Sequence, residues 1–372
     1  MSSRNWRMCL PSLLLSCCFM LPHASAQQRT GEIRPQVHAD RRISFRLEAP
    51  QARSVLLDAS FLSKAQAMKK DAEGVWSFTS QPLAPEIYEY GFTVDGLTIA
   101  DPLNPFVKVW RRASRSMVLV PGETPTFFEE QNVPHGTVQI HRYRSKSLAT
   151  TRGLYVYTPP GYETATGRKY PVLYLLHGSG DTEDAWTIVG RANVIVDNAL
   201  AAGRARPMII AMPYGHTPSV RSDAGRSTRQ QAFAADLLGD VIPFVEKNYR
   251  VYDDAENRAI TGLSMGGGQA LRIGLAHSKL FAWVAAFSSG VPSEEQVSAL
   301  LAEPDVLNED LKLFWVGCGR EDFLFEANQR LLAALKAKGV KHTPRITEGS
   351  HNWRVWRRYL NEVLPLLFQS DK

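Results

Sequence analysis

Cysteine is scarce in this chain. There are four in 372 residues, and Cys9, Cys17 and Cys18 all fall near the N-terminus. If that stretch is removed, Cys318 has no partner, which excludes an internal disulfide framework. The chain also lacks an H-E-x-x-H run, paired cysteines past the N-terminus and any cluster of histidines with acids, so the usual metal signatures are missing. The sequence therefore predicts a fold held by its apolar core, with no metal and no other cofactor.

Other classes of function lack their signatures too. The glycines at 266–268 are not followed by Lys-Ser or Lys-Thr, which excludes a phosphate-binding P-loop. No pair of carboxylates is singled out as the two acids of a glycosidase. Beyond the N-terminus no apolar run is long enough to span a membrane. The net charge is +6 with scattered arginines, so no nucleic-acid partner is expected; even Arg354, Arg357 and Arg358 should lie on a solvated helix face.

The first 26 residues have the layout of a secretory signal. Two arginines precede an apolar stretch that runs to Leu21, and Ala24-Ser-Ala26 has the small residues of a cleavage site. We expect export to the periplasm or beyond, with cleavage after Ala26. Because the signal holds two arginines and no acid, cleavage changes the net charge from +6 to +4. A lipoprotein anchored through Cys17 is the alternative, which the apolar residues after Cys17 disfavour.

Short alternating runs dominate residues 30–122. In the stretch 87–94 every second residue is aromatic or aliphatic, and Asp95-Gly96 behind it is a typical hairpin turn. We therefore expect a small all-β, Ig-like sandwich with most of its aromatic residues in the core. Trp76 and Trp110 are the candidates for stacking on a sugar.

After a linker expected at 123–136 the pattern changes. Residues 137–370 alternate strand-like apolar runs with helical periodicity, of which 233–248 is the clearest example. Such alternation predicts an α/β fold, with a mostly parallel sheet between helices and the functional residues at the carboxyl ends of its strands. The expected strands are 153–157, 172–176, 208–212, 259–261, 283–287 and 313–316.

The pentapeptide Gly262-Leu-Ser-Met-Gly266 follows the pattern G-x-S-x-G. An apolar run precedes it and a helical run follows, which is the strand–turn–helix context of a nucleophile elbow. The two glycines leave room for a sharp turn that exposes the Ser264 hydroxyl. Ser264 is therefore the candidate nucleophile, and the alternative is a glycine-rich loop without chemistry.

A serine hydroxyl needs a base that is itself oriented by a carboxylate, and in this architecture the chain order is Ser, acid, His. Only His277, His342 and His351 follow Ser264. His277 falls in the helix after the elbow and is expected at the surface, while His342 opens a strand-like run. His351 lies in a polar turn just before the last helix, so it is the candidate base.

The candidate acid is Asp322. It follows the strand-like run 311–317 and precedes a helix expected at 325–338. Glu321 is the second candidate, and Glu326 is a neighbour that could substitute. A carboxylate at this position could also serve only as a helix N-cap.

An oxyanion needs two backbone donors. One should be the N–H of Met265, directly after the nucleophile, and the other the N–H of Ser179, in the loop His177-Gly-Ser-Gly180 after an early strand. His177 precedes the serine in the chain, so a structural role in this loop is favoured over that of a base.

These motifs, in this order and spacing, resemble the esterase-D-like branch of the α/β-hydrolases over about residues 135–368. That branch includes feruloyl and acetylxylan esterases of carbohydrate esterase family 1, S-formylglutathione hydrolase, enterochelin esterases and mycolyltransferases. The resemblance implies a triad of Ser264, Asp322 and His351, with the oxyanion hole at Ser179 and Met265. Ser179 stands where many feruloyl esterases have glycine. Residues 90–104 resemble the early-set modules related to carbohydrate-binding family 48.

Possible substrate contacts come from aromatic residues near the expected site. Trp186, Tyr214 and Trp353 could form walls for an aromatic acyl group or a sugar, although all three could be packing. The long polar loop at 213–227 follows a strand end and is expected to overhang the pocket.

Together these features predict an exported serine esterase whose partner is an acylated plant polysaccharide, with feruloyl the first and acetyl the second choice of acyl group. This substrate rests on the resemblance. A siderophore trilactone is the alternative substrate. A glycan-binding protein with a silent hydrolase domain is the alternative from another class.

Overall fold

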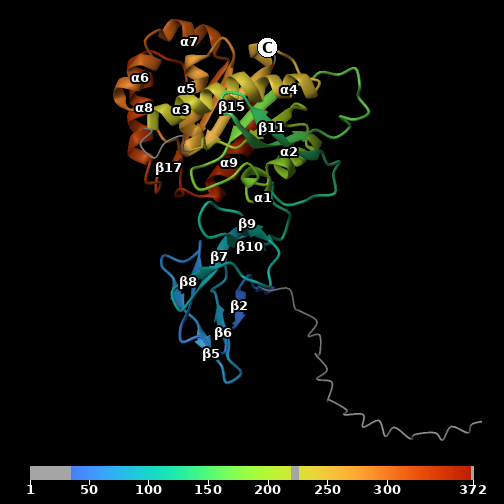
Figure 1. Cartoon of the computed structure of the whole chain (residues 1–372), viewed down its shortest axis with the longest axis vertical. Coiled ribbons are helices and arrows are strands. Elements are labelled where there is room, and N and C mark those ends of the chain that lie inside the picture. The colour runs from blue at the N-terminus through green and yellow to red at the C-terminus, as the bar shows by residue number, and fades with distance from the viewer. Residues whose placement is uncertain (1–34, 219–225, 370–372) are drawn as a thin grey trace, which may run out of the picture. The chain divides into compact units, whose positions relative to one another are not determined.

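The computed structural model of the chain describes residues 35–218 and 226–369 (Figure 1). The expected signal, with its cleavage site and the alternative at Cys17, lies outside the described residues. So does the segment 219–225 of the long polar loop. Among the residues that are described, no helix is both long and apolar enough to cross a membrane.

Residues 36–120 form two antiparallel sheets that share one core. Strand β7 (Glu86–Val94) buries Tyr90 and Phe92 and turns through Asp95 and Gly96, both at positive φ, into β8 (Leu97–Ile99). One sheet has the order β1 (Gln36–Val37), β2 (Ile43–Glu48), β6 (Val75–Thr79), β5 (Lys69–Lys70). The other has the order β4 (Gln66–Ala67), β3 (Val55–Ala59), β7, β10 (Arg115–Val120), β9 (Val107–Lys108), with β8 paired to β7.

Two sheets around one core agree with the predicted sandwich, but one of its proposed sugar-stacking residues is wrong. Trp76 is only 7% exposed and its Nε1 donates to the carbonyl of Ala49 at 3.0 Å. The ring is therefore part of the sandwich core, because β6 turns it inward between the two sheets.

A third, eight-stranded sheet follows in residues 137–347, and it is mixed. The two pairings among its first three strands are antiparallel, and the five pairings that follow are parallel. Its order is β11 (Thr137–Ser145), β12 (Thr150–Thr158), β14 (Ile209–Pro213), β13 (Val172–Leu176), β15 (Arg258–Leu263), β16 (Trp283–Phe287), β17 (Leu313–Gly319), β18 (Thr343–Thr347). All six strands expected from the sequence are present, β18 lies in the strand-like run that His342 opens, and β11 is an addition.

Helices cover both faces of this sheet (Figure 1). Within β13, Leu173 and Leu175 face one layer while Tyr174 and Leu176 face the other, so the strand is apolar throughout. One layer holds α1 (Ala185–Ile188), α2 (Ala192–Ala201), α9 (Trp353–Val363) and η3 (Leu364–Leu366). The other holds α3 (Arg226–Asp236), η1 (Leu237–Val241), α4 (Ile242–Asn248), α5 (Met265–Ala276), α6 (Glu294–Leu300), α7 (Pro304–Asp310) and α8 (Phe325–Ala337). The predicted α/β class is confirmed.

The segment between the last sandwich strand and β11 is packed. Phe128 is 4% exposed and belongs to the same core as α2 and α9. Asn198 of α2 donates to the carbonyls of Phe127 and Glu129 at 3.0 and 2.9 Å. The boundaries 122/123 and 136/137 stay predictions, but the residues between them are held against the third sheet's helices.

The expectation that Arg357 lies on a solvated face is wrong. Its side chain is 1% exposed and forms an ion pair with Glu86 of β7. It also donates to the carbonyl of Val189 at 2.5 Å and lies over the ring of Phe128. Helical spacing identified the trio as part of one helix, but it could not show that another part of the chain covers that face.

Candidate active site

Ser264 occupies a sharp turn between β15 and α5. Its backbone has φ 52° and ψ −113°, a strained conformation for a residue that is not glycine. A Cβ on Gly262 would lie 2.6 Å from the carbonyl carbon of Gly266, and a Cβ on Gly266 would lie 2.6 Å from the carbonyl oxygen of His177. Only glycine fits on either side of the serine. This explains why the elbow needs the G-x-S-x-G pattern.

The structure brings Ser264, His351 and Asp322 together in one hydrogen-bonded chain. The Nε2 of His351 lies 2.9 Å from the Ser264 Oγ. The Nδ1 of the same ring lies 2.8 Å from Oδ2 and 3.0 Å from Oδ1 of Asp322. If Nδ1 carries the proton, as the carboxylate requires, Nε2 is free to accept the serine proton.

Asp322 lies three residues after the last residue of β17, Gly319, and is 4% exposed. Burial alone would raise the pKa of its carboxyl, but the hydrogen bonds from His351 and from the Leu324 N–H outweigh burial and hold the pKa below its usual value. The carboxylate is therefore charged at neutral pH. Glu321, the second candidate, instead accepts a hydrogen bond from the Gly349 N–H, and Glu326 is exposed in the first turn of α8.

The other two histidines after the serine are remote from this chain of hydrogen bonds. His277 is exposed at the end of α5, and the Nδ1 of His342 donates to the carbonyl of Val340 at 2.8 Å. Both positions agree with the sequence interpretation.

One proposed oxyanion donor belongs to Ser179, which borders the same cavity, and the other to Met265, which directly follows Ser264 in the chain. Met265 is the first residue of α5, so its N–H is one of the donors that a helix leaves unpaired. Ser179 follows β13 and lines the cavity beside Ser264. The resulting site has two backbone donors, a hydroxyl and an oriented imidazole, which is the inventory for acyl transfer.

His177 holds the loop that contains Ser179. Its Nδ1 contacts the carbonyl of Gly178 at 2.8 Å, and its Nε2 accepts the N–H of Gly215 at 2.8 Å. Burial lowers the pKa of His177 to about 4, so the ring is neutral at neutral pH. Because both ring nitrogens are engaged by backbone groups, His177 has a structural role and is not placed to act as a base.

The cavity around Ser264 measures about 250 Å³. Its walls include tryptophans from distant parts of the chain, Trp110 before β10 and Trp353 and Trp356 on α9. Three of its residues come from the N-terminal sheets: Glu89, Lys108 and Trp110. Sequence reasoning named Trp110 only as a sugar-stacking candidate and missed Glu89 and Lys108, because contacts across such a distance in the chain leave no local signal.

The structure places the three predicted substrate contacts in different surroundings. Trp353 lines the cavity. Tyr214 is half-buried, and its ring stacks on that of His177, which holds the loop that contains Ser179. Trp186 is wrong as a wall, since it is 1% exposed, donates to the Leu176 carbonyl at 3.0 Å and packs beneath Trp353.

Phe323 is a residue that the sequence analysis missed. It is 76% exposed, and its ring centroid lies 4.4 Å from that of His351. An exposed aromatic ring in contact with the candidate base is available to a substrate. Its position directly after Asp322 was the only available signal.

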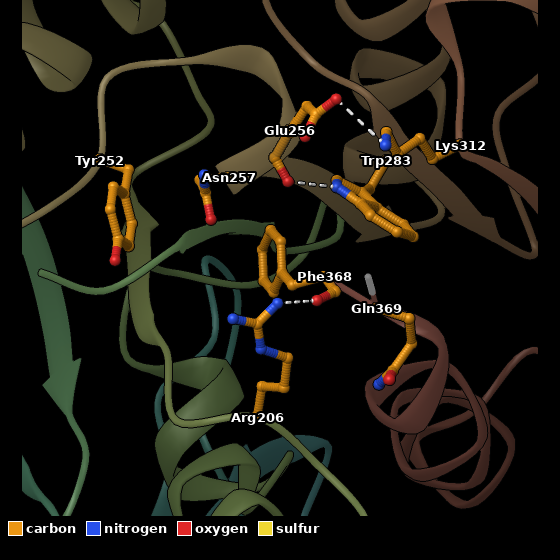
Figure 2. A pocket seen from close by; sticks show the side chains of 8 residues that line it. All are labelled: Arg206, Tyr252, Glu256, Asn257, Trp283, Lys312, Phe368 and Gln369. Carbon is orange, nitrogen blue, oxygen red and sulfur yellow. Dashed lines mark hydrogen bonds and ion pairs between the residues drawn. The ribbon is translucent and has the colours of Figure 1, made fainter. Parts of the chain in front are cut away.

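A second cavity, of about 350 Å³, lies at the opposite, amino-terminal ends of β15, β16 and β17 (Figure 2). Some of its polar groups bond to one another: Lys312 pairs with Glu256 at 3.1 Å, and Trp283 Nε1 donates to the Glu256 carbonyl at 2.7 Å. No histidine or serine is among the described residues that line this cavity.

Residues 145–367 match the model of the esterase family, whose description is "Putative esterase". The chain belongs to the esterase family. This esterase is 32% identical over 350 residues to an endo-1,4-beta-xylanase/feruloyl esterase of Xylanibacter ruminicola, which covers 91% of this chain and 46% of that protein. The chain thus spans less than half the length of the first curated relatives it matches.

Solved structures of esterases are also similar to this chain. A ferulic acid esterase is 29% identical, with a TM-score of 0.58, and covers 64% of this esterase and 100% of that chain. A ferulic acid esterase of Anaeromyces mucronatus, solved with ferulic acid, is 25% identical with a TM-score of 0.58, over 64% of this chain and 93% of that one. The enterobactin esterase of Shigella flexneri, 21% identical, has a TM-score of 0.64 and covers 87% of this esterase and 92% of that chain, which shows a shared fold.

Proposed function

We propose that this protein is a serine carboxylic-ester hydrolase. Ser264 attacks the ester carbonyl while His351 accepts its proton, and Asp322 orients the ring of His351. The N–H groups of Ser179 and Met265 stabilise the oxyanion. His351 then protonates the departing alcohol, and water releases the acid from the acyl-enzyme. The observation that carries this proposal is the continuous hydrogen-bonded chain from Ser264 to Asp322 at the elbow, inside a cavity.

The proposed substrates are acylated plant cell-wall polysaccharides, with feruloyl esters first and acetyl esters next. A relative named as a xylanase/feruloyl esterase and structures named as ferulic acid esterases support this choice. The cavity supports it as well. Trp110, Trp353 and Trp356 offer the flat apolar walls that suit an aromatic acyl group, and about 250 Å³ is a size that such a group can enter.

The test is hydrolysis of methyl ferulate, acetylated xylan and p-nitrophenyl acetate by the mature protein and by Ser264→Ala. We expect the wild-type protein to release ferulate or xylan acetate and Ser264→Ala to lose at least about 10³-fold in kcat. Activity on p-nitrophenyl acetate alone would keep the serine chemistry and remove the polysaccharide assignment.

A siderophore trilactone is the second candidate substrate. The observation in its favour is that the enterobactin esterase structure matches 87% of this chain, and so reaches beyond residues 137–370. The xylanase/feruloyl esterase relative matches 91% of the chain at higher identity, which favours the polysaccharide. Enterobactin belongs in the same assay, and its hydrolysis without release of ferulate or acetate would reverse the order.

A silent hydrolase that only binds glycan is the rival from another class. It predicts that wild-type protein and Ser264→Ala bind xylan equally and that neither turns over any of these esters. The intact arrangement of Ser264, His351 and Asp322 supports catalysis instead.

We also propose that the protein is exported and cleaved after Ala26. The arginines, the apolar stretch and the small residues of the first 26 positions support this. The mass of the protein recovered from a periplasmic or culture fraction tests it, because cleavage leaves Gln27 as the first residue. A mass that retains the first 26 residues, or one with lipid on Cys17, would refute cleavage at this position.

A further inference from the structure

A short segment of the N-terminal sheets reaches the loop that carries the proposed oxyanion donor. This segment, residues 108–111, starts at the end of β9, and we call it the wall segment. The N–H of Arg111 donates to the carbonyl of Gly180 at 2.9 Å. A Cβ on Gly180 would lie 1.7 Å from the Nε1 of Trp110, so the Trp110 ring rests directly on this glycine. The wall segment therefore touches the loop one residue away from Ser179.

Lys108 is the charged residue of the wall segment, and it is 7% exposed. Its Nζ lies 3.2 Å from the Oδ1 of Asp181 and 3.3 Å from the Oε2 of Glu89. The same ammonium group lies over the rings of Trp110 and Trp353, at 5.7 and 5.8 Å from their centroids. Lys108 thus contacts the loop of Ser179 on one side and the helix that follows His351 on the other.

Asp181 brings a negative charge close to the nucleophile. It is 4% exposed, and its Oδ2 would lie 3.0 Å from a Cβ on Gly178, which in turn would lie 3.7 Å from the Cβ of Ser264. In the described part of the chain the Oδ1 of Asp181 makes an ion pair with the Lys108 ammonium and no hydrogen bond of regular geometry. An uncompensated carboxylate here would oppose the negative charge that develops on the substrate oxygen.

We propose that Lys108 is a positioning residue of the esterase site, which the N-terminal sheets supply. It neutralises Asp181 beside the oxyanion and holds the loop of Ser179 in place. This inference rests on the proposed function. It assigns the N-terminal sheets a part in turnover itself, on small esters as well as on polymers, rather than only in binding glycan.

Four variants test the inference: Lys108→Met, Lys108→Arg, Asp181→Asn and the double variant Lys108→Met/Asp181→Asn. The control is Lys70→Met, because Lys70, like Lys108, lies over a tryptophan, but it is exposed in the sandwich, bonds to backbone carbonyls and does not line the cavity. Steady-state kinetics are measured with p-nitrophenyl acetate and methyl ferulate. Thermal melts are recorded for every variant.

We expect Lys108→Met to lower kcat about 10- to 100-fold on both esters, with a smaller change in KM, because the lost interaction acts on the transition state. The double variant should recover most of that loss, since it removes the uncompensated carboxylate as well. Lys108→Arg and Lys70→Met should stay within about threefold of wild-type kcat.

Two results would overturn the inference: a folded Lys108→Met whose kcat matches that of Lys70→Met, or a folded double variant no faster than Lys108→Met. If Lys108→Met loses its folding transition, the kcat of the double variant is compared with that of Asp181→Asn. A kcat of the double variant that is 10-fold or more below that of Asp181→Asn counts against the inference. Failure of the proposed function is a separate result. In that case the wild-type protein hydrolyses none of the esters, or it hydrolyses an ester no faster than Ser264→Ala does.

Discussion

Asp322 and Glu321 are adjacent carboxylates with different surroundings. The first is buried against His351, and the second contacts the Gly349 N–H at the surface. Asp322→Asn keeps the shape but cannot hold the His351 proton on Nδ1, so we expect a loss of about 10³- to 10⁴-fold in kcat.

The matched control is Glu321→Gln, which keeps an acceptor for Gly349 and should remain within a few-fold of wild type. Kinetics on p-nitrophenyl acetate are sufficient, because the effect belongs to the chemical step. A larger loss in Glu321→Gln than in Asp322→Asn would exchange the roles of the two acids.

Phe323 should act on the substrate rather than on the base. Its ring is exposed beside His351. Phe323→Ala should raise KM for methyl ferulate about 3- to 10-fold, as expected for the loss of one aromatic contact of about 1 kcal/mol. The kcat for p-nitrophenyl acetate should hardly change. The aromatic Tyr252, in the cavity of Figure 2, gives the control Tyr252→Ala, for which no kinetic change is expected. An equal loss of kcat on both esters would place Phe323 in support of His351 instead.

At the scale of elements, the connection between α9 and β7 depends on a buried ion pair. Arg357 and Glu86 are 1% and 7% exposed at their side chains. Arg357→Met removes the buried charge partner of Glu86 and leaves the carboxylate with Arg354, which is 67% exposed and lies 3.8 Å away. We therefore expect a loss of about 3–5 kcal/mol in the free energy of unfolding. Urea denaturation measures it.

The control for this pair is Arg345→Met, whose partner Glu362 makes an exposed ion pair and which should cost about 0–1 kcal/mol. Replacing Glu86 and Arg357 together by apolar residues should recover much of the loss. Equal effects of Arg357→Met and Arg345→Met would show that burial does not matter here.

Strands could be predicted from the sequence where their own residues form a distinctive apolar pattern. The bounds of β13 and β16 agree with the expected runs 172–176 and 283–287, because a strand buried on both faces is a continuous apolar run. By contrast, β11 is an edge strand whose residues are mostly polar and only partly buried, with no such run. Helix 233–248 was located, but it begins at Arg226 and contains the wider turn of η1.

The same contrast applies to the candidate site. Ser264, Asp322 and His351 each follow a strand end and could be found in sequence by order and type of turn. Lys108 and Glu89 could not, because their place in the cavity depends on how two parts of the chain pack. Trp186 was misjudged because its helix, α1, turns the indole inward to the carbonyl of Leu176.

For the whole molecule, buried neutral histidines make stability depend on pH. Burial lowers the pKa of His177 from 6.5 to about 4, and that of His216 to about 3. Between pH 6.5 and 4 this histidine is protonated in the unfolded chain, whereas folded His177 stays neutral. Stability is therefore complete above about pH 6.5 and falls as the pH decreases through this window, by about 3 kcal/mol for His177.

Urea midpoints at pH 7.5, 5.5 and 4.5 check this dependence. His177→Gln is the comparison, because it removes the titrating group and should flatten the slope across the series. A wild-type midpoint that does not move between pH 7.5 and 4.5 would contradict the assignment. Cys318 adds nothing in this range, since burial raises the pKa of its thiol to about 12.

The wall segment has a practical consequence for anyone who recombines this chain with others. Sandwich modules ahead of an enzyme are commonly treated as exchangeable cassettes. Here Trp110 rests on Gly180 and Lys108 borders the cavity of Ser264, so an exchange of the N-terminal sheets replaces part of the catalytic wall. A chimera would have to inherit residues 108–111 together with the loop that they contact, and a library built on domain boundaries alone would separate them.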